Sequence, residues 1–190
     1  DVRTSLPPDS ALLSFVRYNR LALAPPSTVG PGRASSMGSY PTRTIPSYAA
    51  FVLRPEEREP IVIAIGDAND IDELVADCRK QAITRLIQVS GTFQAAEKAS
   101  RAAGTRLRRR VWDPVVRNLG GKRRVFVVPD GALNLIPLTA LPIDGSSYLL
   151  EAGPIVHYLT AERDLVPIAQ SRRMGQGLLA VGAPAFAHAP

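Results

Sequence analysis

The chain has 190 residues, which is the usual size of one domain. Hydrophobic residues make up 45% of the chain, enough for a buried core, and no apolar run approaches the ~18 residues that a membrane-spanning helix needs. The 23 basic and 17 acidic residues give a net charge of +6, and a single cysteine excludes an internal disulfide and a cysteine-rich metal cage.

The first part of the chain predicts strands around a long loop. Ala11–Tyr18 is apolar, with aromatic and β-branched residues, and predicts a strand. Residues 25–48 are rich in Pro, Gly and Ser, so we expect a long mobile loop that joins two strands, an inserted surface excursion rather than a cleavage-prone or partner-binding loop. Tyr48–Arg54 and Ile61–Ile65, joined by a polar turn, predict an antiparallel hairpin that completes a three-stranded flank.

Two helices are expected next. Asp70, with Glu73 three residues later, forms a capping-box pattern that predicts a helix start. The apolar face of this helix consists of Ile71, Leu74, Val75 and Cys78. This spacing points Cys78 inward, so we interpret it as a small buried hydrophobe and not as a nucleophile. Residues 93–111, rich in Ala and Arg, predict the second helix.

A continuous apolar run, Val125–Val128, predicts a strand that is buried on both faces. The run ends at the turn Pro129–Gly131, which combines a fixed φ, a carboxylate and a permissive glycine. Asn134–Leu141 predicts a short helical or irregular segment with its leucines against the sheet, and Tyr148–Glu151 with Ile155–Leu159 predicts a hairpin.

Two further elements follow. Thr160–Glu162 with Asp164 predicts a cap and a short helix, and Gly177–Gly182 predicts another buried strand. The histidines are poor catalytic candidates, because His157 sits inside an apolar strand and His188 in a short tail.

Nine of the basic residues lie between Arg101 and Arg124. We interpret them as a solvated helix face and not as a nucleic-acid patch, because no aromatic stacking platform interleaves with them. The chain also lacks a phosphate-binding glycine loop, a dinucleotide fingerprint and a metal-ligand spacing, so no cofactor and no metal are expected.

The three segments VFVVPDGALNLIPLTALP, YLLEAGPIVHYLTAERDLV and GLLAVGAPAF resemble, in this order, the CHAT domain. That family is caspase-like and separase-related, and it often follows tetratricopeptide repeats. The resemblance is strong from Arg123 to Phe186 and looser before it.

The resemblance implies an α/β fold: a caspase-like mixed sheet with flanking helices and an N-terminal antiparallel flank, incomplete in this chain. Residues 1–190 would form the N-terminal portion of one CHAT domain of a bacterial, cytoplasmic cysteine endopeptidase. The family's histidine and cysteine motifs lie further along, so no residue of this chain is assigned as catalytic. The chain alone is expected to be inactive, either as one product of autoprocessing or because it ends early.

In caspase-like folds the loop after the first central strand helps line the pocket for the substrate's P1 side chain. The resemblance therefore makes Asp130 and Asn134 candidate substrate-binding residues, with Asp130 pairing with a basic P1 residue. The alternative, which we favour, is that Asp130 caps its own turn.

The expected partners are the rest of the same domain, a protein or peptide substrate and a repeat-domain regulator, with no membrane and no nucleic acid. Two other functions stay open. One is a non-catalytic CHAT scaffold or partner-binding module, and the other is a basic nucleic-acid-associated accessory domain.

Overall fold

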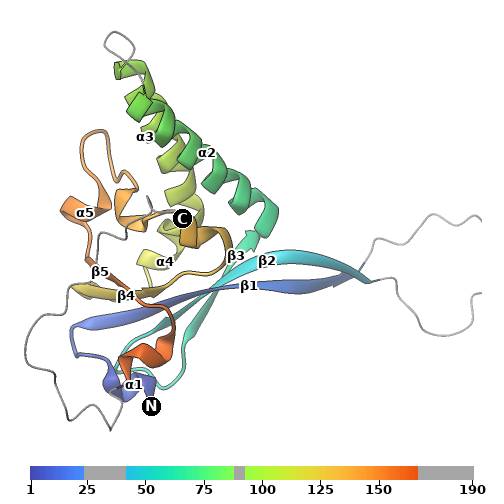
Figure 1. The fold of residues 1–190 in the computed structure, drawn as a ribbon. Coiled ribbons are helices and arrows are strands. Elements are labelled where there is room, and N and C mark those ends of the chain that lie inside the picture. Colours follow the sequence, from blue (N-terminus) through green and yellow to red (C-terminus); the bar gives the residue numbers. More distant parts are fainter. Residues whose placement is uncertain (24–41, 88–92, 167–190) are drawn as a thin grey trace, which may run out of the picture.

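The computed structural model describes residues 1–23, 42–87 and 93–166. A five-stranded sheet forms the centre, with the strand order β3-β2-β1-β4-β5 (Figure 1). Its strands are β1 (Ser10–Leu23), β2 (Thr42–Leu53), β3 (Ile61–Asp67), β4 (Arg124–Val128) and β5 (Ile155–Tyr158).

Helices and short helical turns connect and cover these strands. They are α1 (Val2–Ser5), α2 (Ala68–Ile87), α3 (Phe93–Val111), α4 (Asp113–Val116), the 3₁₀ turns η1 (Gly131–Leu135) and η2 (Leu138–Ala140), α5 (Leu149–Ala152) and the 3₁₀ turn η3 (Glu162–Leu165). The long helices α2 and α3 pack against each other on one side of the sheet, whereas α1 and η3 lie together on the other side (Figure 1).

The sheet is mixed. β1 pairs antiparallel with β2, and β2 pairs antiparallel with β3, which confirms the expected N-terminal flank and the hairpin within it. β4 lies between β1 and β5 and pairs parallel with both. The apolar run that the sequence placed at the centre of the sheet is therefore an internal strand with helices on its flanks, and the expected mixed α/β fold is confirmed.

Side chains alternate between two cores. Val125 and Val127 of β4 are fully buried in the larger core, which the sheet forms with α2 and α3. Phe126 and Val128 point the other way, into a small core that Leu6 and Leu12 share. This alternation follows from the period of two along a strand, and it fixes which side of the sheet each later side chain occupies.

The structure corrects one prediction in the C-terminal half. Tyr148–Glu151 and Ile155–Leu159 do not form a hairpin. Leu149–Ala152 is a short helix, closed by the Glu151 carboxylate, which accepts a bond from the Tyr148 backbone N–H at 2.8 Å. β5 pairs with β4 instead, because the helical turn lets the chain re-enter the sheet in the parallel direction.

Two boundaries also differ from the predictions. β2 begins at Thr42, so residues 42–48 belong to a strand and not to the expected 25–48 loop, the rest of which lies outside the described residues. α2 begins at Ala68 and not after Asp70, because Asp67 accepts a bond from the Asn69 N–H at 2.9 Å and so caps the helix first. The strand expected at Gly177–Gly182 lies outside the described residues.

The outer ends of β1 and β2 form a two-stranded arm. β4 pairs only with residues 10–14 of β1, and β3 pairs with β2 only from Ser47 onward. Beyond those points β1 and β2 continue alone as an antiparallel ribbon, which projects from the body of the molecule (Figure 1). We call residues 17–23 with 42–46 the arm.

Candidate functional site

The turn that follows β4 lies at the C-terminal end of a buried parallel strand, where α/β folds place their sites. Asp130 is the last residue with an extended backbone, and Gly131 then turns the chain with a φ of +54°. One oxygen of the Asp130 carboxylate accepts the Gly131 N–H at 2.7 Å, and the other accepts the Arg17 N–H of β1 at 2.8 Å. The carboxylate therefore closes its own turn and also ties that turn to the neighbouring strand.

The side chain of Tyr48 holds the same turn through a hydrogen bond. Its hydroxyl accepts the Ala132 N–H at 2.9 Å and donates to the Asp72 carboxylate of α2 at 3.0 Å. The Arg17 guanidinium lies 3.6 Å from that carboxylate. Burial is the main cause of a raised Tyr48 pKa, and the bond to Asp72 raises it further, so the hydroxyl keeps its proton.

Both substrate-binding candidates from the sequence lie on this turn. The Asn134 amide donates to the Gly131 carbonyl at 3.3 Å, and its side chain is exposed. Arg17, Tyr48 and Asp72 complete the polar cluster, yet nothing in the sequence singled them out. Their local patterns are those of strand and helix residues, and Tyr48 meets Ala132 only through the pairing of distant segments.

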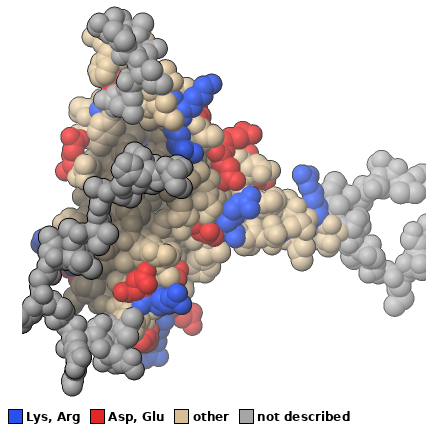
Figure 2. Space-filling model, in the orientation of Figure 1, with Lys and Arg blue, Asp and Glu red and all other residues tan. Residues whose placement is uncertain are grey.

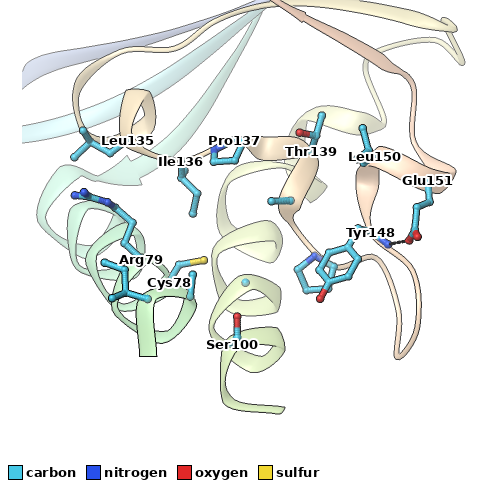
Figure 3. A pocket seen from close by; sticks show the side chains of 15 residues that line it. Cys78, Arg79, Ser100, Leu135, Ile136, Pro137, Thr139, Tyr148, Leu150 and Glu151 are labelled. Atoms are coloured by element: carbon cyan, nitrogen blue, oxygen red, sulfur yellow. Dashed lines mark hydrogen bonds between the residues drawn. The ribbon is translucent and has the colours of Figure 1, made fainter. Parts of the chain in front are cut away.

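A cavity of about 600 Å³ lies between α2, α3 and the segment that follows the β4 turn (Figure 3). Its wall is mostly apolar, with Ile136 and Pro137 above and Tyr148 at one side (Figure 3). The Cys78 sulfur is directed into the interior between the two helices (Figure 3). Leu135, the last residue of η1, lines this cavity, so it adjoins the segment that begins at the β4 turn.

Cys78 is nearly buried, as the sequence predicted. Burial raises the pKa of its thiol, and the neighbouring Asp77 carboxylate raises it further. A nucleophilic cysteine needs the opposite environment, one that favours the thiolate. The geometry thus assigns Cys78 to packing.

His157 lies on the other side of the sheet from Cys78. It is the register partner of Phe126 and packs against that ring edge-to-face, with centroids 5.6 Å apart. Phe126 belongs to the small core, whereas Cys78 belongs to the core beneath α2 and α3. The sheet separates the imidazole from the thiol, so these two side chains form no catalytic pair. His188 lies outside the described residues.

Ion pairs occupy many of the basic residues between Arg101 and Arg124. Five of the nine contact a carboxylate: Arg101–Glu97, Arg106–Asp77, Arg108–Asp113, Lys122–Glu56 and Arg123–Asp9. Blue and red side chains accordingly intermingle over the body of the molecule (Figure 2). This is the surface that the sequence analysis described as a solvated helix face.

The described part of the chain holds neither a metal site nor a membrane-spanning helix. No group of three or more His, Cys, Asp or Glu side chains is placed to hold a metal ion within residues 1–23, 42–87 and 93–166. Over the same residues, no helix combines the length and the apolar character that crossing a bilayer requires.

The fold and the turn after β4 define an α/β protein with a mixed sheet and a polar turn at the end of an internal parallel strand. In the comparison with protein families, residues 101–189 match the model of the CHAT domain. The resemblance seen in the sequence is confirmed over this part of the chain, which includes β4, its turn and β5. No curated protein and no solved structure matches the chain.

Proposed function

We propose that this chain is the N-terminal portion of a bacterial caspase-like cysteine endopeptidase of the CHAT family. It would supply the central strand and part of the substrate cleft. The observation that carries the proposal is the position of the β4 turn. It lies inside the matched segment, at the C-terminal end of a strand with parallel neighbours on both sides.

In this proposal the reactive histidine and cysteine come from polypeptide that follows the described residues. The thiolate would be the nucleophile and the imidazole would move the proton. Such a pair would occupy loops at the same edge of the sheet as Asp130, since parallel strands end together there. A cytoplasmic location would keep the thiolate reduced.

The experiment is intact-mass analysis of the complete protein after treatment with a cysteine-directed peptidyl probe. We expect one covalent adduct on a cysteine other than Cys78 and, if autoprocessing occurs, two chains from one precursor. An adduct on no cysteine, in a folded protein that is given its repeat-domain regulator, would overturn the peptidase proposal. That result would leave the non-catalytic CHAT scaffold as the function.

Asp130 is proposed to line the pocket for a basic P1 residue. Both its oxygens already accept backbone N–H groups, but a carboxylate has about four lone-pair positions, so it retains capacity to accept an arginine or lysine. Its side chain is partly exposed, so a bound substrate could reach it.

We expect Asp130→Asn in the complete enzyme to reduce kcat/KM for basic P1 substrates by about tenfold or more, with little change for neutral ones. The asparagine oxygen still accepts one N–H, so the turn is disturbed less than by alanine. Fluorogenic peptides that differ only at P1 provide the measurement, and Asn134→Ala is a companion variant on the same turn. If the P1 preference is unchanged, Asp130 caps its own turn and does not contact the substrate.

A further inference from the structure

The arm has two free edges that differ in their ability to accept another strand. The pairing of β1 with β4 ends at Ser14, and the pairing of β2 with β3 ends at Ser47. Past those residues each strand has one side that no described strand pairs with. An unpaired strand edge presents backbone N–H and C=O groups to any extended chain that approaches it.

The direction of the backbone groups on β1 follows from two independent observations. The Arg17 N–H points away from β2, because it donates to Asp130 on the β4 side. Asn19 is the register partner of Pro46, and a proline, which has no N–H, fits a ladder only where that position faces outward. The N–H and C=O groups of Arg17, Asn19 and Leu21 therefore alternate with the bonds to β2 and point to the open edge.

Pro46 closes the opposite edge. It removes a donor from the outer side of β2, which is a common way to block strand addition. The β1 edge holds no proline, and among the described residues only Asp130 bonds to it, at Arg17. The two edges of the arm are thus unequal, and β1 is the one that can accept a strand.

The charge of the arm selects the partner. The arm contains three arginines, Arg17, Arg20 and Arg43, and no acidic residue or lysine. Arg20 and Arg43 lie on the same face, because Arg43 pairs with Ala22, two positions from Arg20, and neither forms an ion pair with any described side chain. The outer part of the arm shows blue side chains and no red ones in Figure 2. An acidic chain complements this surface.

The other face of the arm carries an exposed leucine at its outer part, with Thr44 as its register partner. Leu21 is 70% exposed and lies on the opposite face from Arg20, since neighbouring residues of a strand alternate. A strand added beside β1 would place alternate side chains next to Arg20 and next to Leu21. Acidic residues suit the first set of positions, and apolar residues suit the second.

We propose that the edge of β1 between Arg17 and Leu23 is a docking site for an extended segment of a partner protein in which acidic and apolar side chains alternate. The segment would add to the sheet as a strand, with backbone hydrogen bonds to Asn19 and Leu21. It would run toward Asp130 at the end of β4. The site does not depend on whether the complete protein is a peptidase.

Other occupants fit less well. Residues 24–41 and 167–190 of this chain carry arginines and no acidic residue, so neither supplies the opposite charge. A second copy would bring its own Arg17 and Arg20 against the same residues, which disfavours pairing. A nucleic acid would satisfy the arginines but would leave the open backbone groups and Leu21 without partners.

The test is fluorescence anisotropy of the whole 190-residue protein with a labelled peptide of alternating Glu and Val, about eight residues long, at low salt. Asn19→Pro removes one outward N–H from the β1 edge, and we expect it to weaken binding about tenfold. Thr44→Pro is the matched control. Thr44 pairs with Leu21, so its N–H faces outward on the β2 edge, and its loss should leave the affinity unchanged.

The charge is tested separately. Arg20→Glu should weaken the Glu–Val peptide about tenfold or more, whereas Arg109→Glu, an exposed arginine on α3, should not. A Lys–Val peptide should not bind. If Asn19→Pro lowers the melting temperature, its loss of binding could come from unfolding. The comparison of Arg20→Glu with Arg109→Glu then decides whether the arm binds the peptide.

Three results would overturn the proposal: no saturable binding of the Glu–Val peptide, equal losses in Asn19→Pro and Thr44→Pro, or self-association that Arg20→Glu strengthens. Salt-sensitive binding of a labelled DNA duplex that Asn19→Pro leaves intact would assign the arm to nucleic acid instead. Each result is read as binding, so it is independent of proteolytic activity.

Discussion

Gly131 is the residue that lets the β4 turn and Tyr48 come together. Its φ of +54° favours glycine, and a Cβ at this position would lie 2.2 Å from the Tyr48 hydroxyl and 2.9 Å from the Arg17 side chain. The hydroxyl cannot withdraw without losing its bonds to Ala132 and Asp72. The backbone conformation and the close approach therefore both require glycine here.

Gly131→Ala should lower the free energy of unfolding by about 3 kcal/mol, the sum of backbone strain and a steric clash. Gly121→Ala is the matched control, because Gly121 has a φ of +68° but nothing within 4 Å of the added Cβ. It should cost only about 1 kcal/mol. Urea unfolding of the two variants measures the difference, and equal costs would show that the contact with Tyr48 is not tight.

The Cys78 thiol gives a pH dependence with a definite sign. Burial raises its pKa in the folded state, so the unfolded chain loses the thiol proton at a lower pH than the folded protein does. The stability from the protonated thiol is fully present below the unfolded pKa, and it is lost as the pH rises through the folded pKa.

We therefore expect iodoacetamide to modify Cys78 more slowly than a free cysteine at neutral pH, with the rate rising at higher pH than for the free thiol. Intact-mass kinetics across a pH series measure this directly. Because Cys78 is the only cysteine in the chain, Cys78→Ala gives the background. A rate at neutral pH equal to that of free cysteine would contradict the buried, protonated thiol.

At the scale of elements, Arg101 attaches the loop before α5 to helix α3. Its guanidinium donates to the backbone carbonyls of Asp144 and Ser146, at 3.3 and 2.8 Å, and forms an ion pair with Glu97. It also lies 4.3 Å from the centre of the Tyr148 ring, in a cation–π contact. One side chain thus holds a loop that borders the cavity.

Arg101→Ala should raise amide hydrogen exchange across residues 144–148 by about tenfold, because the loop loses its charge-assisted bonds to the helix. Exchange in β4 should stay unchanged. Arg109→Ala removes an exposed arginine of the same helix and should have no effect on the loop. Uniform acceleration over the whole chain would indicate loss of global stability instead.

Local patterns predicted some elements and not others. The apolar run at Val125–Val128 and the helix over 93–111 have signals that lie within their own segments, and both are confirmed. Tyr148–Glu151 resembled a strand because its aromatic and leucine residues suit one, but Leu149 is buried from a helical turn. For the start of α2 the sequence pattern indicated Asp70 as the cap, whereas in the structure Asp67 caps the helix first.

The candidate site depends on relations that no local pattern contains. Asp130 contacts Arg17 across 113 positions of sequence, and Tyr48 contacts Ala132 across 84. The sequence predicted the turn and its carboxylate, since a proline, an aspartate and a glycine end an apolar run there. It did not predict the tyrosine and aspartate that support the turn, because strand register and helix packing bring them there.

At the scale of the whole molecule, the sheet divides the chain's reactive side chains. Cys78 faces the core under α2 and α3, and His157 packs on Phe126 on the other side. A proton transfer between them would have to cross the sheet. Cys78 and His157 are therefore both expected to be dispensable for the cysteine peptidase activity that we propose.

We expect Cys78→Ser and His157→Ala, each made in the complete protein, to leave the rate of labelling by a cysteine-directed peptidyl probe within about twofold of wild type. Serine is close in size to cysteine, and His157 is exposed, so both variants should fold. Asp130→Asn, on the β4 turn, provides the contrast, since it should change labelling by probes with a basic P1 residue. Loss of labelling in Cys78→Ser with folding intact would mean that the probe reaches the thiol through the cavity that Cys78 lines. The separation of Cys78 from His157 by the sheet would then not exclude Cys78 as the nucleophile.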